Sequence, residues 1–251
     1  GEQVGARAAV IRKIHHVGIV VESLSRSYTF YRDTLGLPLI KEADVKDQGV
    51  KAALLSAGES EIELLEPLAS ETGVAKFLAK RGEGLHHLCF EADDVAAALD
   101  GLSARGVPLI DRCPRPGLAG MVAFLHPRAC AGVLVELATP TEPVRDSVAP
   151  VKLKRLVIGA RDAKGTAATF RELFALSEET ANDGPRVMLR AGPSALLMVP
   201  AEEVGGTEGL VAISFLAQDF PALIRRLEGA RVSMLRGAGE ATVEPVSSHG
   251  V

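Results

Sequence analysis

The feature that most constrains this chain is an internal repeat. Residues 13–21 and 84–90 are strand-like stretches that each carry a His-His pair, and the second histidine of the pair, His16, recurs 71 positions later as His87. A fixed period marks copies of one supersecondary unit, which bury their apolar faces against each other. The repeat therefore decides how the rest of the chain is divided.

Each histidine strand leads into the same succession of elements. Apolar residues at helical spacing predict helices over about 23–34 and 95–104, each ended by a glycine, Gly36 and Gly106. Short strands are expected next, at about 38–43, 49–56 and 60–66 in the first copy and at 108–111, 120–126 and 132–138 in the second. Each copy is therefore a β-α-β-β-β module.

The second half repeats the pattern in weaker form. Residues 139–151 are polar and rich in proline, which is typical of a linker. Beyond them we expect strands at 153–160 and 210–215 and helices at 166–174 and 220–229. The sequence thus predicts an α+β fold of four modules in two pairs, the last one truncated. The expected domains are residues 1–138, the linker 139–151 and a degenerate second pair at 152–251.

Composition excludes several classes of protein. The chain has 251 residues, 47% of them hydrophobic, which suffices for a core. Its net charge of −4 and the lack of a basic tract argue against nucleic acid or a membrane surface as partner. Residues 1–7 lack the apolar stretch of a signal peptide. The odd, sparse set of three cysteines indicates reduced thiols, so we expect a cytoplasmic protein.

Four residues of metal-ligand type occupy matching strand positions. His16 and His87 lie on first strands, and Glu63 and Glu136, 73 positions apart, lie inside apolar last strands. A buried carboxylate costs several kcal/mol unless it is paired or bound to metal. Two imidazoles and two carboxylates suit a divalent transition metal such as Co, Zn, Ni or Mn.

Neighbouring residues of the same types are expected to have other roles. Strand alternation turns His15 and His86 to the opposite face, where a structural role is expected. Glu61 and Glu66 are expected on a solvated face.

Several segments within residues 14–138 resemble the vicinal-oxygen-chelate superfamily, which includes glyoxalases, bleomycin resistance proteins and extradiol dioxygenases, and within it the methylmalonyl-CoA epimerases. The resemblance rests on residues 14–19, 47–50, 61–68, 75–87, 124–127 and 132–137. It implies paired modules that form an open cup around a metal held by His16, Glu63, His87 and Glu136. Glyoxalase I resembles this ligand set equally well.

The resemblance implies an isomerase. A metal that chelates the thioester carbonyl and the carboxylate of methylmalonyl-CoA, or of a related 2-substituted acyl-CoA, stabilises the enolate formed when C2 loses its proton. Exchange on both faces of C2 needs two acid/base groups, for which Glu136 and then Glu63 are the candidates. Some similar epimerases carry an acid shortly after the Gln-Gly-Val segment, where this chain has Lys51, Ala52 and Ala53.

Other residues are candidates for substrate contact. Gln48 could orient the substrate or serve as a turn residue, and His126 could contact its carboxylate or hold a loop. Lys76, Lys80 and Arg81 could meet coenzyme A phosphates or form an ordinary solvated helix face. The expected partner is an acyl-CoA or another metal-chelating small molecule, bound by a monomer or homodimer.

The second half lacks the ligand set. By the repeat offset, His16 corresponds to Arg155, the partner of Glu63 falls near Leu196 or Leu197, and His87 corresponds to Ala212. We therefore expect no metal there. Three alternatives to the epimerase remain: a glyoxalase-type lyase acting on a hemithioacetal, a ring-cleaving dioxygenase and a non-catalytic small-molecule-binding protein.

Overall fold

The computed structural model describes residues 10–143, 148–179 and 184–251. The chain divides into two compact units, each assembled from stretches that are distant in sequence. The first unit comprises residues 1–15, 87–143 and 154–212, and the second comprises 16–86, 144–153 and 213–251. The domain boundaries expected from the sequence remain a prediction.

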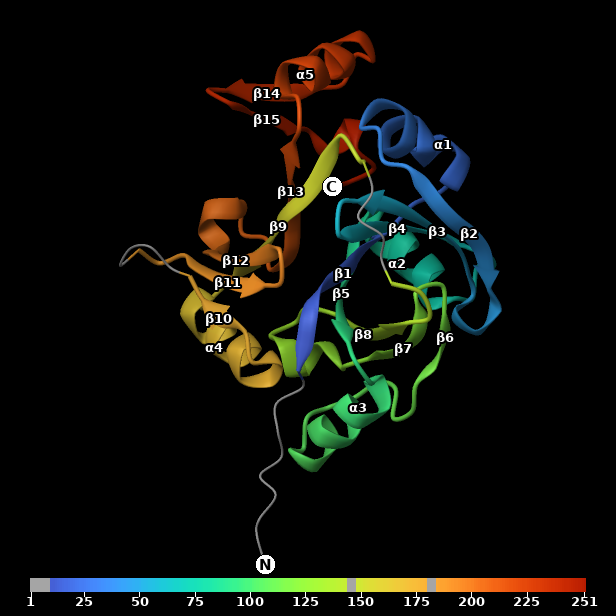
Figure 1. Cartoon of the computed structure of the whole chain (residues 1–251), viewed down its shortest axis with the longest axis vertical. Coiled ribbons are helices and arrows are strands. Elements are labelled where there is room, and N and C mark those ends of the chain that lie inside the picture. The colour runs from blue at the N-terminus through green and yellow to red at the C-terminus, as the bar shows by residue number, and fades with distance from the viewer. Residues whose placement is uncertain (1–9, 144–147, 180–183) are drawn as a thin grey trace, which may run out of the picture. The chain divides into compact units, whose positions relative to one another are not determined.

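Strands make up more of the structure than helices do, and the two are combined in mixed α+β modules (Figure 1). The first module contains β1 (Ile11–Val20), α1 (Leu24–Tyr28), a π-helix (Thr29–Thr34), β2 (Leu39–Val45), a 3-10 turn (Lys46–Gln48), β3 (Val50–Ala57), β4 (Ser60–Pro67) and α2 (Gly73–Arg81). The second contains β5 (Gly84–Ala92), α3 (Val95–Ala104), β6 (Arg115–Gly117), β7 (Gly120–Phe124), a 3-10 turn (Pro127–Cys130) and β8 (Val135–Pro140).

The remaining elements form two further modules. The third contains β9 (Val151–Ala160), α4 (Ala163–Phe174), β10 (Ser177–Glu178), β11 (Val187–Ala191), β12 (Ser194–Pro200) and a 3-10 turn (Ala201–Val204). The fourth contains β13 (Gly209–Ala217), α5 (Phe220–Gly229), β14 (Met234–Gly237), β15 (Glu240–Val243) and a 3-10 turn (Pro245–Ser247).

Three modules share one strand arrangement. Their orders are β2-β3-β4-β1, β6-β7-β8-β5 and β10-β11-β12-β9. In each, the first strand of the module pairs in parallel with the last, and the other pairings are antiparallel. The fourth module has a two-stranded hairpin, β14-β15, after its helix. The expected βαβββ modules are confirmed.

The junction between first strand and helix is the same in all four modules. A side-chain oxygen caps each helix by accepting a hydrogen bond from the backbone N–H three residues on, and the caps are Ser23, Asp94, Asp162 and Asp219. Such a cap satisfies an N–H that the helix leaves without a partner. Counting back seven residues from each cap gives His16, His87, Arg155 and Ala212. These are the positions that the repeat made equivalent.

One strand lies elsewhere than the sequence predicts, and one predicted α-helix has a second part of a different helix type. The strand expected at 108–111 is absent, and β6 lies at Arg115–Gly117 instead. The amides of Ile110 and Asp111 both donate to the carbonyl of Phe124, so this stretch turns rather than forming a regular ladder. The helix expected over 23–34 is a short α-helix that widens into a π-helix.

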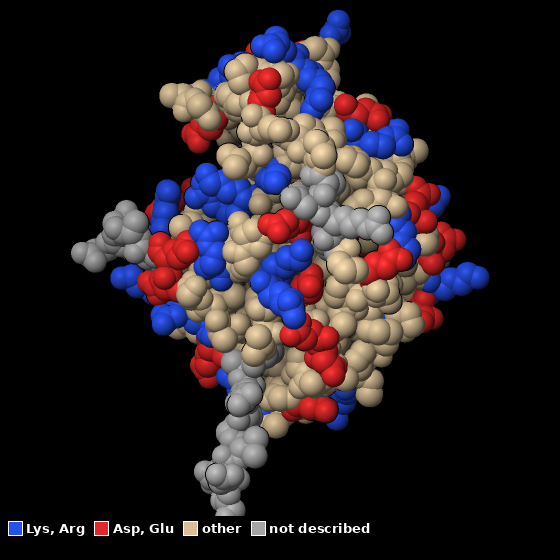
Figure 2. Space-filling view, in the orientation of Figure 1, with Lys and Arg blue, Asp and Glu red and all other residues tan. Residues whose placement is uncertain are grey.

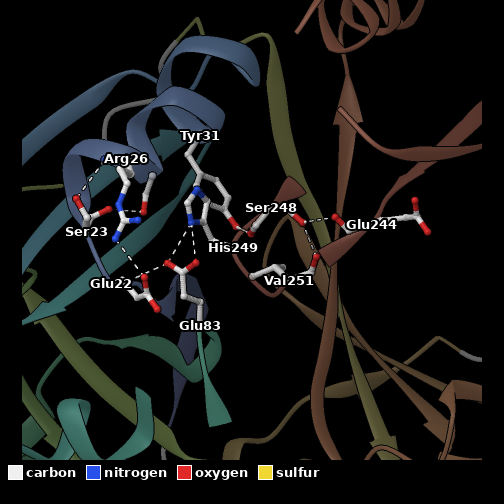
Figure 3. Close-up of polar contacts among 10 residues, drawn as sticks. Glu22, Ser23, Arg26, Tyr31, Glu83, Glu244, Ser248, His249 and Val251 are labelled. Atoms are coloured by element: carbon white, nitrogen blue, oxygen red, sulfur yellow. Dashed lines mark hydrogen bonds and ion pairs between the residues drawn. The ribbon is translucent and has the colours of Figure 1, made fainter. Parts of the chain in front are cut away.

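Residues 248–251 contact the first module through polar interactions within the second unit (Figure 3). The buried Tyr31 hydroxyl donates to the carbonyl of Ser248 at 2.6 Å, and the His249 ring lies 3.0 Å from Glu83. Gly250 has φ +85° and lies so close to the carbonyl of Glu83 that a Cβ atom would clash with it. Residues 248–250 form a turn.

The structure separates the three cysteines into two classes. Cys113 is exposed, whereas Cys89 and Cys130 are buried, and burial raises the pKa of the Cys130 thiol to about 12. The thiolate is the reactive form, and about one part in ten thousand of the Cys130 thiol is deprotonated at pH 8.

We expect iodoacetamide to label one thiol, that of Cys113, rapidly in the native protein and all three in denaturant, as counted by mass spectrometry. Rapid native labelling of Cys130 would contradict this.

The described helices include none long and apolar enough to cross a membrane. On the face seen in Figure 2, Lys and Arg side chains are interspersed with Asp and Glu side chains.

Candidate metal centre

His16 and Glu63 form one histidine–carboxylate pair within the second unit. β1 pairs in parallel with β4, with Gly18 opposite Glu63, so His16 and Glu63 are diagonal neighbours on one face of the sheet. The His16 Nε2 atom lies 3.6 Å from Glu63 Oε1. The alternation of the strands thus brings together two residues that the sequence separates by 47 positions.

His87 and Glu136 form the equivalent pair within the first unit. β5 pairs in parallel with β8, with Cys89 opposite Glu136, and His87 Nε2 lies 3.9 Å from Glu136 Oε1. The ring of Phe124, which is in register with Glu136 on β7, meets the His87 ring edge to face at 5.4 Å between centroids. This packing fixes the orientation of the imidazole.

The two pairs obey one geometric rule. In each, the glutamate is in register with the residue two positions after the histidine, which is Gly18 in one pair and Cys89 in the other. The match that the sequence showed as spacings of 71 and 73 is therefore also a match of strand register.

All four side chains are buried. The exposed fractions are 0% for His16, 1% for His87, 6% for Glu63 and 3% for Glu136. Ionised carboxylates are almost never this buried unless a positive charge or hydrogen bonds compensate the loss of water. This burial is difficult to reconcile with an ordinary surface role for either glutamate.

The geometry of each pair is compatible with an ion. Separations of 3.6 and 3.9 Å exceed a hydrogen bond. Two atoms that each bind Zn²⁺ at about 2.0–2.2 Å lie no more than about 4.4 Å apart. The described residues that could each offer a ligand atom to a metal ion include His16, Glu63 and His87, and also His15 and Cys89. The donors are imidazole nitrogens, carboxylate oxygens and a thiol, which suit divalent transition metals.

The neighbouring histidines differ from these pairs. His15 is buried in β1, at 2% exposure. His86 packs edge to face on Phe77, with 5.1 Å between ring centroids. Burial of the His86 ring, and to a smaller extent the charge of Arg81, lowers its pKa to about 4, so this ring is neutral at pH 7.

The prediction that Glu61 and Glu66 lie on a solvated face is wrong for Glu61. Glu61 is 6% exposed and lies opposite His16 in the β1–β4 ladder, and β4 is an inner strand with β1 on one side and β3 on the other. Glu66 is half-buried and caps a helix, because its Oε2 accepts a hydrogen bond from the backbone N–H of Leu24 at 2.8 Å.

The two candidate substrate-binding residues lie at turns. Gln48 is half-buried at the end of a 3-10 turn, before Gly49 with φ +67°. His126 is exposed, and its Nδ1 accepts a hydrogen bond from the backbone N–H of Arg128 at 3.1 Å, which caps the following turn. Lys76, Lys80 and Arg81 are exposed on α2. Substrate contact by any of them remains a prediction.

The residues that follow the Gln-Gly-Val segment lie on β3. Ala52 is fully buried and faces Leu65, so it shares the sheet face of Glu63. Glu42, a carboxylate that the sequence analysis did not single out, lies opposite Ala53 and therefore on the other face. Lys51 and the Tyr28 hydroxyl bind Glu42, and the Tyr28 hydrogen bond, above all, lowers the pKa of that carboxyl.

The third module has other residues where the first has its pair. β9 pairs in parallel with β12, and Val157, two positions after Arg155, lies opposite Leu197. Arg155 and Leu197 thus occupy the register positions of His16 and Glu63. The described part of the third module has no histidine–carboxylate pair at this place.

Comparison with known proteins identifies relatives for the first half. The model of the Glyoxalase/Bleomycin resistance protein/Dioxygenase superfamily matches residues 15–124. An uncharacterized protein of Bacillus subtilis, YqjC, is 41% identical over 131 residues, which are 52% of this chain and 94% of that protein. The ethylmalonyl-CoA/methylmalonyl-CoA epimerase of Cereibacter sphaeroides is 37% identical over 131 residues, 51% of this chain and 98% of that protein.

Two solved structures resemble this chain, one over its first half and one over most of its length. A variant of methylmalonyl-CoA epimerase from Streptomyces coelicolor, in complex with 2-nitronate-propionyl-CoA, matches with TM-score 0.51 and 37% identity over 53% of this chain and 99% of that one. A mutant of 4-hydroxymandelate synthase from Streptomyces coelicolor matches with TM-score 0.70 and 19% identity over 92% of this chain and 78% of that one. The second likeness is one of fold alone, and it extends over both halves.

Proposed function

The chain belongs to the Glyoxalase/Bleomycin resistance protein/Dioxygenase superfamily, and from this membership we propose that it is a metal-dependent epimerase acting at C2 of methylmalonyl-CoA or a related 2-substituted acyl-CoA. One observation carries the proposal. The half of the chain that matches methylmalonyl-CoA epimerases in sequence and structure contains two buried histidine–carboxylate pairs of identical register.

The proposed metal ligands are His16, Glu63, His87 and Glu136. The donor set fits cobalt, zinc, nickel or manganese, and the buried carboxylates gain a compensating charge from a cation. A divalent ion bound there would act as a Lewis acid on the substrate's oxygens and stabilise the negative charge that develops as C2 loses its proton.

The chain's own residues supply the proton transfers. Epimerisation removes the C2 proton on one face and returns a proton on the other, so two groups must exchange it. Glu136 is the first candidate, and Glu63, its counterpart in the other pair, is the second. The methyl group of Ala52 offers no acid, and Glu63 is the second candidate that the repeat provides for that role.

Further parts of the proposal concern the surroundings of the site. Gln48 would orient the acyl group and His126 would contact the substrate carboxylate, both from turns. The substrate is an acyl-CoA, because solved relatives hold acyl-CoA compounds. The odd, sparse set of three cysteines agrees with a reducing compartment such as the cytoplasm.

A glyoxalase-type lyase acting on a hemithioacetal is the second candidate. It is favoured by the two-histidine, two-carboxylate donor set together with Ala52, where some similar epimerases carry an acid. Both reactions remove a proton next to a carbonyl, so the two enzymes share this chemistry and differ in the substrate they act on.

The test is deuterium exchange at C2 of methylmalonyl-CoA, followed by NMR in D₂O with the metal-loaded protein. We expect catalytic incorporation of one deuterium together with interconversion of the two epimers. The same protein is then assayed with the hemithioacetal of methylglyoxal and glutathione. Turnover of the hemithioacetal without exchange in methylmalonyl-CoA would replace the epimerase with the lyase, and activity on neither would leave a binding protein.

A further inference from the structure

We propose that the third module has a second, metal-free ligand site, which binds a small organic anion with a short apolar body. The site lies on the face of the β11-β12-β9 sheet that carries Arg155. All of its residues belong to the first unit. The inference goes beyond the proposed function, because it needs neither the metal nor the two histidine–glutamate pairs.

Arg155 is the first reason. It is half-buried at the strand position that His16 occupies in the first module. Its Nε atom is inaccessible to solvent and has no hydrogen-bond partner among the described residues. A buried N–H of a cation without an acceptor costs free energy that a bound anion would recover.

A second arginine occupies the same row of the sheet. Arg190 on β11, Ala195 on β12 and Arg155 on β9 are in register, one beside the next. Neighbouring strands are about 4.8 Å apart, so the backbones of Arg190 and Arg155 lie about 10 Å from each other, with the small side chain of Ala195 between them. Arg190 is ion-paired with Glu179, whereas Arg155 has no ion pair among the described residues, so Arg155 contributes the charge available to a ligand.

The next row supplies an apolar surface. Met188, Leu197 and Val157 are in register beside the arginine row, and all three are half-buried. Beyond them the backbone carbonyl of Thr207 lies against Gly159, where a Cβ atom would clash with it. The segment that contains Thr207 therefore bounds the apolar row at this end.

The opposite face of the same sheet is closed. Leu156, Ile158 and Leu196 are buried there, and α4 packs on β11 and β12. The two faces of the sheet therefore differ, because α4 covers one face whereas the arginine face is partly accessible to solvent. A charged row next to an apolar row fits a molecule with an anionic head and a short hydrocarbon body.

Guanidinium groups bind carboxylates and phosphates alike through paired hydrogen bonds, so the shared chemistry is the oxyanion head. Two probes distinguish the heads: hexanoate carries a carboxylate and hexyl phosphate a phosphate. 1-Hexanol has the same apolar body without a charge. Whichever anion binds more tightly identifies the head group, and binding of 1-hexanol as tight as that of both anions would overturn the role of Arg155.

The experiment is calorimetric titration of the full chain with these probes in EDTA, combined with NMR shifts of backbone amides. We expect saturable binding of an anion with the largest shifts at residues 155–157, 188 and 197. Arg155→Met should weaken binding about tenfold or more, since hydrogen bonds to charged groups are the strong ones. Arg190→Met should weaken it less, because Glu179 already binds that side chain.

Arg161→Met is the matched control, since it removes the same charge from an exposed residue at the end of β9. It should bind the anion as the unaltered protein does. Equal affinity of the Arg155→Met variant and the unaltered protein, or shifts centred on His16 and His87, would overturn the proposal. Because EDTA removes any metal, failure of the epimerase assay would leave this result unaffected.

Discussion

Replacing Glu136 with glutamine is expected to slow C2 proton exchange by about 10²- to 10⁴-fold, the usual contribution of a positioned acid/base group. Glutamine retains the shape and an oxygen ligand but cannot accept the C2 proton. The loss should therefore fall on kcat, with KM changed much less. Initial rates of deuterium incorporation at several concentrations of methylmalonyl-CoA measure both constants.

The matched control is Glu91→Gln, a half-buried carboxylate on β5 that lies near Lys13. It should retain the exchange rate of the unaltered protein. Metal content, measured on each variant, separates loss of a proton acceptor from loss of a ligand. A Glu136→Gln variant that keeps its metal and exchanges at the full rate would remove Glu136 from the reaction and leave Glu63 as the acid/base candidate.

Removing the metal is expected to lower the thermal stability of the protein substantially. A ligand present at about 100 times its dissociation constant stabilises the folded state by about 2.7 kcal/mol. For a chain of this size that corresponds to about 5–10 °C in Tm. The physical reason is that the buried carboxylates of Glu63 and Glu136 lose a compensating charge. Differential scanning calorimetry with and without a chelator measures the change.

Histidine substitutions identify the ligands of that metal. His16→Ala and His87→Ala should each lose the ion or bind it at least tenfold more weakly, whereas His15→Ala and His86→Ala, one residue away, should retain it. Elemental analysis of the purified variants measures the number of metal ions per chain. One ion per chain is expected; two would show that each pair binds separately, and loss from the His15 and His86 variants would reverse the assignment of faces.

The sequence located most elements because local chemistry repeats with the modules. The four helix caps, Ser23, Asp94, Asp162 and Asp219, depend only on a side chain and an amide three residues on. Positive φ at Gly36 and Gly106 likewise ends two helices as the glycines predict. Where pairing depended on a distant carbonyl, as at residues 108–111, the sequence misplaced the strand.

Burial was harder to predict than alternation. Strand period shows which residues share a face, and it sets His15 and His86 apart from His16 and His87. It cannot show which faces are covered, so Glu61 was expected in solvent although it is buried. The same limit applies to Glu42, which only the β2–β3 register separates from the face of Ala52.

By itself, the sequence determined the modules, the four ligand-type residues and the loss of those residue types from the second half, because each of these follows from residue identity and period. Only the tertiary structure decided the register that puts Glu63 beside His16 and Glu136 beside His87. It also decided that Arg155, Ala195 and Arg190 form one row. Register arises from pairing between strands far apart in sequence, and a shift of one residue would turn every side chain of a strand to the other face.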